Sequence, residues 1–160
     1  MAFSSKEDSN FRIDGVTLDD KTLARRSPQI EQERKVAIYD LLGENHFQPR
    51  GSGGGPYHLI LGIEENRLVF DVRLSEGTEH GRVMLSLTPF RRLLKDYNAL
   101  CESYNAALHD APSRIEAIDM GRRGLHDDGA RLLRERLDGK IAIDFLTARR
   151  LFTLLCALSL

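Results

Sequence analysis

The stretch YHLILGIEENRLVFDVRLSEGTEHGRVMLSLTPFRRLLKDYNALCESYNAAL, from Tyr57 to Leu108, decides the fold because it changes from a strand pattern to a helix pattern. Its first part holds two runs rich in β-branched and aromatic residues, Tyr57–Ile63 and Leu68–Leu74, with Glu65-Asn66 between them as a tight turn. A third run, Arg82–Leu87, follows a polar turn that contains glycine. We therefore expect three consecutive antiparallel strands that form a β-meander.

The second part of this stretch predicts the clearest helix of the chain. Thr88-Pro89 combines a capping residue with a proline at the first helical position. Apolar residues then recur at helical spacing: Phe90, Leu93, Leu94, Tyr97, Leu100, Cys101, Tyr104 and Leu108. Together the two parts predict an α+β fold, in which a small, mainly antiparallel sheet, a meander plus added strands, packs with about four helices.

The N-terminal side of the meander predicts one more strand and one more helix. Apolar residues between Phe11 and Leu18 alternate as in a strand, and the alternation slips by one position at Gly15. Ser27-Pro28 repeats the combination of cap and proline, and an apolar stripe then extends over residues 28–44. The sequence PRGSGGGP at residues 49–56 is expected to be a flexible connector.

The helical region after residue 112 contains three glycines that allow two interpretations. Ser113 and Glu116 form a capping-box pattern that opens a helix predicted to continue to about Leu137. Each glycine in a helix interior costs about 1 kcal/mol relative to alanine. The glycines at positions 121, 124 and 129 therefore either break the helix or let another backbone pack closely against it.

The C-terminal segment predicts a short strand followed by an apolar helix. Lys140–Ile143 has the strand pattern, and Asp144 is placed to cap a helix that begins at Phe145. After Arg150 this helix is apolar nearly all round. Such a helix is either enclosed by its own domain or covered by a second subunit, so the sequence allows a homo-oligomer through the C-terminal helix.

Length and composition favour one soluble domain. A chain of 160 residues with 41% hydrophobic and 29% charged residues is expected to fold as a single α+β domain over residues 11–160, after a disordered N-terminal tail at residues 1–10. Neither the polar N-terminus nor any apolar run matches a secretory signal or a membrane span, and the two cysteines, Cys101 and Cys156, do not form a disulfide framework. We therefore expect a cytoplasmic protein with no membrane partner.

Paired arginines are the most distinctive feature of the C-terminal half, although the formal net charge of the whole chain is -1. The pairs are Arg91-Arg92, Arg122-Arg123 and Arg149-Arg150. Guanidinium groups suit bidentate recognition of phosphate or carboxylate. The residues predicted to bind an anion or a partner are Arg91, Arg92, Lys95, Arg122 and Arg123. Ordinary ion pairs are the favoured alternative, and the binding interpretation requires two pairs to meet in an exposed recess.

The segment DMGRRGLHDD, Asp119–Asp128, is the best candidate site. If its glycines open the helix, Arg122 and Arg123 are placed to hold an anion while His126 or Asp119 acts as acid or base. If the helix continues, Asp119 and the arginines are only neighbours on a solvated face, and this second interpretation is favoured. The remaining ligands for a metal ion are missing at suitable spacing, so neither a metal site nor a cofactor is expected.

Five strings in the same order carry a resemblance to a known family: GGPYHL, LSLTPFRRLLKDY, CESY, IEAIDMGRRGLH and TARRLFTL. From about Ser27 onward the chain resembles a bacterial family called uncharacterised protein family 0262. The resemblance implies a small cytoplasmic bacterial protein. It implies no activity, and it transfers no catalytic residue to this chain.

Three functions remain open from the sequence. The first is a non-enzymatic binding or regulatory module whose basic C-terminal half engages an acidic protein, a nucleic acid or a phosphorylated ligand. The second is a small enzyme that acts on a phosphorylated or carboxylated substrate, with Arg122 and Arg123 as anion clamps and His126 as acid or base. The third is a structural subunit whose apolar C-terminal helix seals an oligomer.

Overall fold

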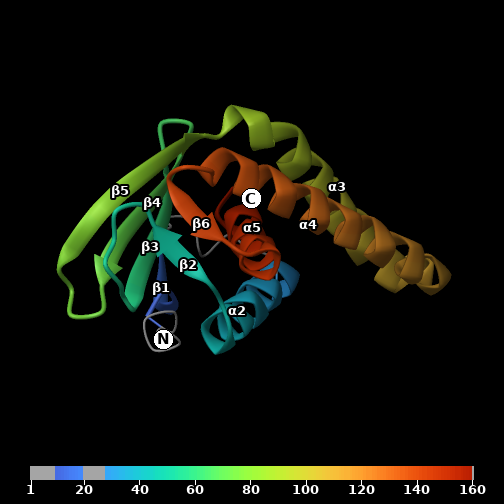
Figure 1. Cartoon of the computed structure of the whole chain (residues 1–160). Coiled ribbons are helices and arrows are strands. Elements are labelled where there is room, and N and C mark those ends of the chain that lie inside the picture. The colour runs from blue at the N-terminus through green and yellow to red at the C-terminus, as the bar shows by residue number, and fades with distance from the viewer. Residues whose placement is uncertain (1–9, 20–27, 160) are drawn as a thin grey trace.

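The computed structural model describes residues 10–19 and 28–159. In these residues the strands are β1 (Ile13–Asp19), β2 (Phe47–Pro49), β3 (Tyr57–Glu64), β4 (Arg67–Leu74), β5 (Glu79–Ser86) and β6 (Ile141–Ile143). The α-helices are α2 (Pro28–Gly43), α3 (Arg91–Asp110), α4 (Ile115–Leu137) and α5 (Phe145–Ser159). This arrangement confirms the predicted α+β class (Figure 1). The predicted cap Ser27 and, apart from Asn10, the predicted tail lie outside the described residues.

The main sheet has the strand order β1-β3-β4-β5. The predicted meander is confirmed, and Glu65 and Asn66 in its first turn both have positive φ, 48° and 63°, as a two-residue hairpin turn of this type requires. Strand β1 adds to the meander in parallel with β3, and its register shifts between Ile13 and Gly15. A Cβ on Gly15 would lie 2.4 Å from Nδ1 of His58, so any other residue at this irregularity would have to displace the His58 ring.

A second, two-stranded sheet was not expected from the sequence. Strand β2 pairs antiparallel with β6, with Phe47 opposite Ile143 and Pro49 opposite Ile141. The sequence interpretation assigned Pro49 to the flexible connector, which was wrong for this residue. A three-residue strand gives too little alternation to be recognised, and proline is tolerated at the edge of a sheet.

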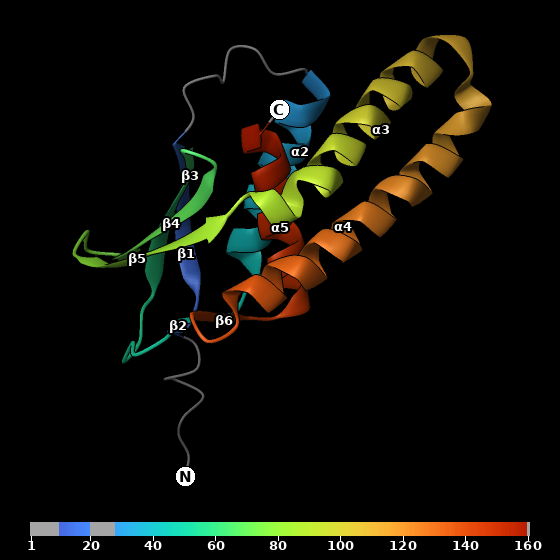
Figure 2. The same cartoon turned by 90° about the horizontal axis from the view of Figure 1, so that it is seen from above.

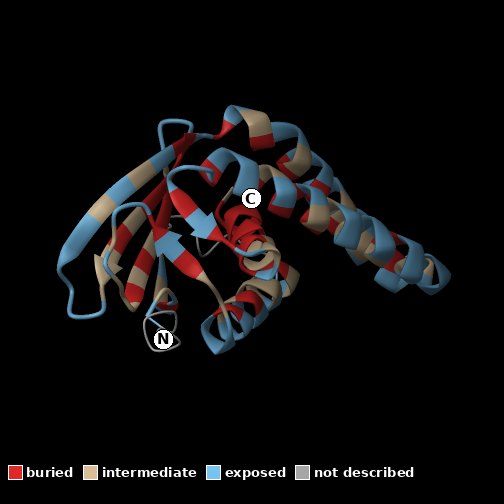
Figure 3. Cartoon of the chain, viewed as in Figure 1, coloured by how far each residue is buried: buried red, intermediate tan, exposed pale blue. Residues whose placement is uncertain are grey.

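Helix α5 forms the centre of the molecule. It lies between the main sheet and helices α3 and α4, with α2 packed beside it (Figure 2), and burial concentrates along it (Figure 3). Its buried residues are Thr147, Ala148, Leu151, Phe152, Leu154, Leu155, Cys156, Ala157 and Leu158. The apolar helix is thus enclosed by its own chain, which removes the reason for predicting an oligomer through it. That oligomer stays an untested prediction.

Helices α3 and α4 form an antiparallel hairpin that extends away from the sheet (Figure 2). Helix α4 is continuous from Ile115 to Leu137, so its glycines do not break it. The close-packing explanation holds for Gly129, where a Cβ would lie 2.4 Å from the ring of Phe152. At Gly124 a Cβ would meet nothing within 4 Å. At Gly121 a Cβ would lie 3.6 Å from the Leu100 side chain, which is an ordinary contact, so packing requires only one of the three glycines.

Two of the predicted helix caps are wrong and one is confirmed. Thr88 and Ser113 each lie inside a short 3-10 turn, and neither α3 nor α4 has a side-chain hydrogen bond at its N-cap. Each 3-10 turn contains a proline, Pro89 as the second residue of the first and Pro112 as the first residue of the second, and each turn moves the start of the α-helix past the expected capping residue. Asp144 does cap α5, because its Oδ1 accepts a 2.9 Å hydrogen bond from the backbone N–H of Thr147.

Candidate functional site

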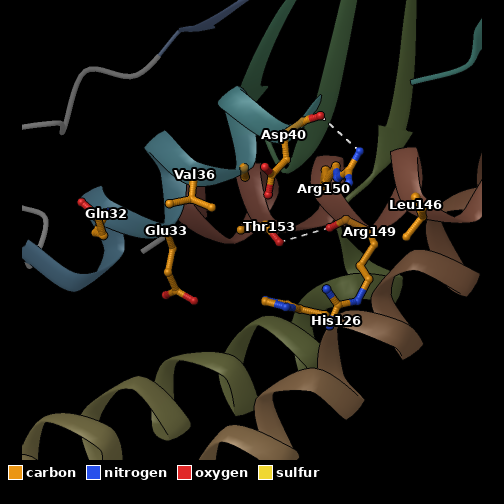
Figure 4. A pocket seen from close by; sticks show the side chains of 10 residues that line it. Gln32, Glu33, Val36, Asp40, His126, Leu146, Arg149, Arg150 and Thr153 are labelled. Carbon is orange, nitrogen blue, oxygen red and sulfur yellow. Dashed lines mark hydrogen bonds between the residues drawn. The ribbon is translucent and has the colours of Figure 1, made fainter. Parts of the chain in front are cut away.

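A cavity of about 310 Å³ opens where α2, α4 and α5 meet, and we call it the helix cavity (Figure 4). Helix α2 contributes polar and apolar side chains to one wall, α5 contributes the opposite wall, and α4 contributes a histidine. The lining residues are Gln32, Glu33, Val36, Ala37, Asp40, His126, Leu146, Arg149, Arg150 and Thr153. Its volume falls at the lower end of the range found for small-molecule sites.

His126 is the one histidine of the cavity and is only 8% exposed. Its ring stacks on Tyr97 with the centroids 5.3 Å apart, and its Nε2 is buried without a hydrogen-bond partner among the described residues. Burial, which is the largest cause, and the positive charges of Arg149 and Arg122 together lower the pKa of His126 to about 4. The imidazole is therefore neutral at pH 7.

Glu33 is the polar centre of the cavity wall formed by α2. Its Oε2 accepts a 2.7 Å hydrogen bond from the Tyr97 hydroxyl, and its Oε1 accepts a 3.0 Å bond from Nη1 of Arg122. Arg122 also pairs with Asp119 and lies over the Tyr104 ring, 5.5 Å from its centroid. Three helices are thereby joined through one carboxylate, and the charge of Arg122 is already compensated.

Only one of the three guanidinium nitrogens of Arg149 has a hydrogen-bond partner among the described residues. Its Nε donates a 2.9 Å hydrogen bond to Asp127, and its two terminal nitrogens make no hydrogen bond to any described residue. Figure 4 shows its side chain extending from α5 toward the His126 ring. The cavity therefore contains a guanidinium group with unused donors beside a neutral imidazole.

The next residue, Arg150, stabilises the contact between α5 and α2. Its Nη1 donates to the backbone oxygens of Asp40 and Glu44, at 3.1 and 2.9 Å (Figure 4 shows the first). These oxygens belong to the C-terminal end of α2, where carbonyl groups lack helical partners and a positive charge is favourable. Arg150 thus ties α2 to α5.

The structure separates the predicted anion-binding residues instead of bringing them together. Arg122 lies over Tyr104, which follows Arg91 by thirteen positions along α3 and is therefore about 20 Å from it. Arg91 donates to Asn66 in the β3–β4 turn, and Arg92, Lys95 and Arg123 are exposed. Pairs 91-92 and 122-123 consequently form no common recess. The role of each pair in binding a partner stays a prediction.

The candidate residues His126 and Asp119 also separate, because Asp119 pairs with Arg122 outside the cavity lining. The sequence interpretation missed Glu33 and Asp40, which it treated as part of a charged helix face. It noted the pair Arg149-Arg150 but did not assign it to a site. The sequence signals for this site were His126 and the third arginine pair. The approach of α2 to α4 is a tertiary contact, which no local pattern indicates.

The cysteines show no sign of nucleophilic chemistry. Both are buried and free, and burial raises the pKa of Cys101 to about 11 and that of Cys156 well above its usual value. Across residues 10–19 and 28–159, no three His, Cys, Asp or Glu side chains gather as a metal site would require. In the same residues, none of the helices has the length and apolar character needed to cross a membrane.

Fold and cavity together define a small α+β protein with a ligand-sized cavity between three helices. The chain belongs to the uncharacterised protein family UPF0262, whose sequence model matches residues 10–160. It is 55% identical over 159 residues to a UPF0262 protein of Rhodopseudomonas palustris strain TIE-1, covering 99% of this chain and 98% of that protein. It is 54% identical over 155 residues to one of Nitrobacter winogradskyi strain Nb-255, covering 96% and 93%. No solved structure matches the chain.

Proposed function

We propose that this protein is a non-enzymatic binding module that holds a small carboxylate with an apolar body in the helix cavity. The observation that carries this proposal is the position of Arg149. Its terminal nitrogens are unused, it lies beside a buried neutral imidazole, and it lines a cavity of about 310 Å³. A guanidinium fork of this kind binds a planar carboxylate through two parallel hydrogen bonds.

The charges of the cavity favour a singly charged ligand. Two carboxylates, Glu33 and Asp40, and two guanidinium groups, Arg149 and Arg150, line it, so the formal charge of these four side chains is balanced. The carboxylate of Asp40 is exposed and makes no hydrogen bond to a described residue. It would repel a phosphate dianion more strongly than a carboxylate monoanion. A carboxylate therefore fits better than a phosphate.

The rim of the cavity favours an apolar group attached to the carboxylate. Val36 of α2 and Leu146 of α5 are 46% and 51% exposed, and both line the cavity. Covering such side chains contributes about 25 cal/mol for each Å² of apolar surface removed from water. An aromatic or aliphatic carboxylate gains this term, whereas acetate gains little of it.

Calorimetric titration with benzoate, acetate and inorganic phosphate tests the proposal. We expect benzoate to bind most tightly and phosphate most weakly. Replacing Arg149→Gln removes two charge-assisted hydrogen bonds and is expected to weaken benzoate binding at least about tenfold. Arg136→Gln is the matched control, since Arg136 lies exposed at the end of α4 outside the cavity lining. Equal affinities of the wild type and Arg149→Gln would overturn the proposal.

A small enzyme is the second candidate, because the buried Nε2 of His126 has no partner in the described residues and a substrate is a suitable one. The lowered pKa argues against it, since an imidazole with a pKa of about 4 is a weak general base at pH 7. Turnover of a panel of carboxylic and phosphoric esters discriminates the two functions. Turnover that disappears in a folded His126→Gln variant would establish the enzyme and overturn the binding-only function.

A further inference from the structure

A second recess differs from the helix cavity in its charge, because all the charged side chains that line it are basic. It is a groove of about 330 Å³ between the β2–β6 ladder and strands β4 and β5. Its four basic residues are Arg50, His80, Arg82 and Lys140, and we call it the basic groove. An adjoining hollow of about 390 Å³ shares Arg50 and Lys140 with it.

No acidic residue lines either hollow. Arg82 donates a 2.9 Å hydrogen bond to Glu64, but this carboxylate is 56% exposed and such a surface ion pair contributes little to stability. The side chains of Arg50 and Lys140 form no ion pair with a described residue. Three permanent positive charges therefore surround a recess whose floor includes the buried residues Val72 and Pro49.

Glycines in the lining of the two hollows leave the backbone there uncovered by side chains. Gly51 and Gly139 have φ of 78° and 80°, a conformation that favours glycine. Gly139 lines both hollows, and Gly51 lines the adjoining hollow. Their N–H groups make no hydrogen bond to a described residue. Arg50 holds the two sides together, since its backbone N–H donates to the Lys140 carbonyl oxygen at 2.9 Å. Cationic side chains and free amides thus line the same surface, as in many phosphate sites.

We propose that the basic groove binds the diphosphate group of a small molecule such as a nucleoside diphosphate. Each of the two hollows would hold one phosphate of the diphosphate, and Arg50 and Lys140, which line both, would contact both phosphates. Together with Arg82 they supply three positive charges, which match the charge of a diphosphate. The lack of lining carboxylates favours a phosphate here, in contrast to the helix cavity. The two sites have no lining residue in common, so either one stands without the other.

Titration of the full chain with inorganic pyrophosphate, orthophosphate, adenosine diphosphate and a short single-stranded oligonucleotide tests this inference. We expect pyrophosphate and adenosine diphosphate to bind at least about tenfold more tightly than orthophosphate. Lys140→Gln and Arg50→Gln are each expected to weaken pyrophosphate binding about tenfold or more. Arg114→Gln, an exposed arginine between α3 and α4, is the control and leaves the affinity unchanged.

Thermal melting of each variant separates loss of binding from loss of folding. Lys140→Gln is the safer variant, because this side chain is exposed and bonded to no described residue. Equal affinity for pyrophosphate and orthophosphate, or unchanged pyrophosphate affinity in folded Lys140→Gln, would overturn the inference. Binding of the oligonucleotide without binding of pyrophosphate would also overturn it and would make the groove a nucleic-acid contact. Benzoate binding to the helix cavity is unaffected by either groove variant.

Discussion

Gly129 of α4 lies directly against the ring of Phe152 in α5, so closely that a Cβ at this glycine would be 2.4 Å from the ring carbons. Phe152 is fully buried, and the ring of His126 lies at its edge with the centroids 6.3 Å apart. The close contact of the two helices at Gly129 therefore adjoins the ring of His126 in the helix cavity.

Alanine at Gly129 and alanine at Gly124, two of the three glycines of α4, are expected to have opposite effects on stability. Gly129→Ala gains about 1 kcal/mol of helix propensity but forces the Phe152 ring to move, an overpacking cost of about 1–3 kcal/mol. We expect a net loss of stability. Gly124→Ala meets no atom within 4 Å and is expected to stabilise by about 1 kcal/mol. Urea unfolding measures both, and a stabilising Gly129→Ala would show that the helices are not packed as described.

His126 is expected to make the protein less stable in mild acid. Its pKa is lowered from 6.5 to about 4 in the folded state. As the pH falls below about 6.5 the unfolded chain takes up a proton that the folded chain refuses, so stability is lost until about pH 4. Between pH 7 and pH 5 this loss amounts to about 2 kcal/mol. Urea unfolding of His126→Gln should lack this component, and an identical pH dependence in both proteins would contradict the assignment.

Removing the charge of Glu33 is expected to loosen the contact between α2 and α4. In Glu33→Gln the partly buried Arg122 loses one carboxylate, and we expect a loss of about 1–3 kcal/mol in the free energy of unfolding. Asp128→Asn breaks an exposed pair with Arg131 on α4 and is the control, with an expected change below about 0.5 kcal/mol. Equal effects of the two substitutions would show that the Glu33 contact is no more than a surface ion pair.

Asn45, which follows helix α2, is expected to contribute to stability through hydrogen bonds of its side chain to the backbone. Its side chain accepts a 2.7 Å hydrogen bond from the Ile13 N–H, and its Nδ2 donates to the carbonyl oxygens of Ile13 and Leu41 at 2.9 and 2.7 Å. Asn45→Ala leaves these backbone groups unpaired, at a cost of about 1–3 kcal/mol. Asn98→Ala, at an exposed position of α3 without such bonds, is the control. Similar thermal melting of the two variants would contradict the prediction.

Local patterns in the sequence predicted most of the fold. The meander, the turn at Glu65-Asn66 and the cap at Asp144 each depend on residues that are close in the chain, so periodicity and turn chemistry identify them. The parallel pairing of β1 with β3 and the β2–β6 ladder depend on contacts between distant residues. The residue pattern within one strand does not indicate which other strand it pairs with.

The candidate site was predicted only in part for the same reason. The segment 119–128 was selected, and its His126 does line the helix cavity. Asp119 and Arg122, which were selected with it, form an ion pair and do not line the cavity. Arg122 also pairs with Glu33, which does line it. The basic groove was not predicted from the sequence, because Arg50, His80 and Lys140 are far apart in the chain. They come together only when the two sheets form.

The histidine NMR signals of His126 during a benzoate titration test the central claim most directly. Benzoate bound by Arg149 offsets a positive charge that lowers the pKa of His126, so we expect saturable shifts of these signals and a raised His126 pKa in the complex. In Arg149→Gln the shifts should be much smaller at the same benzoate concentrations, because binding is at least about tenfold weaker. Signals that do not move at millimolar benzoate, or that move equally in Arg149→Gln, would contradict the claim that the helix cavity is a carboxylate site.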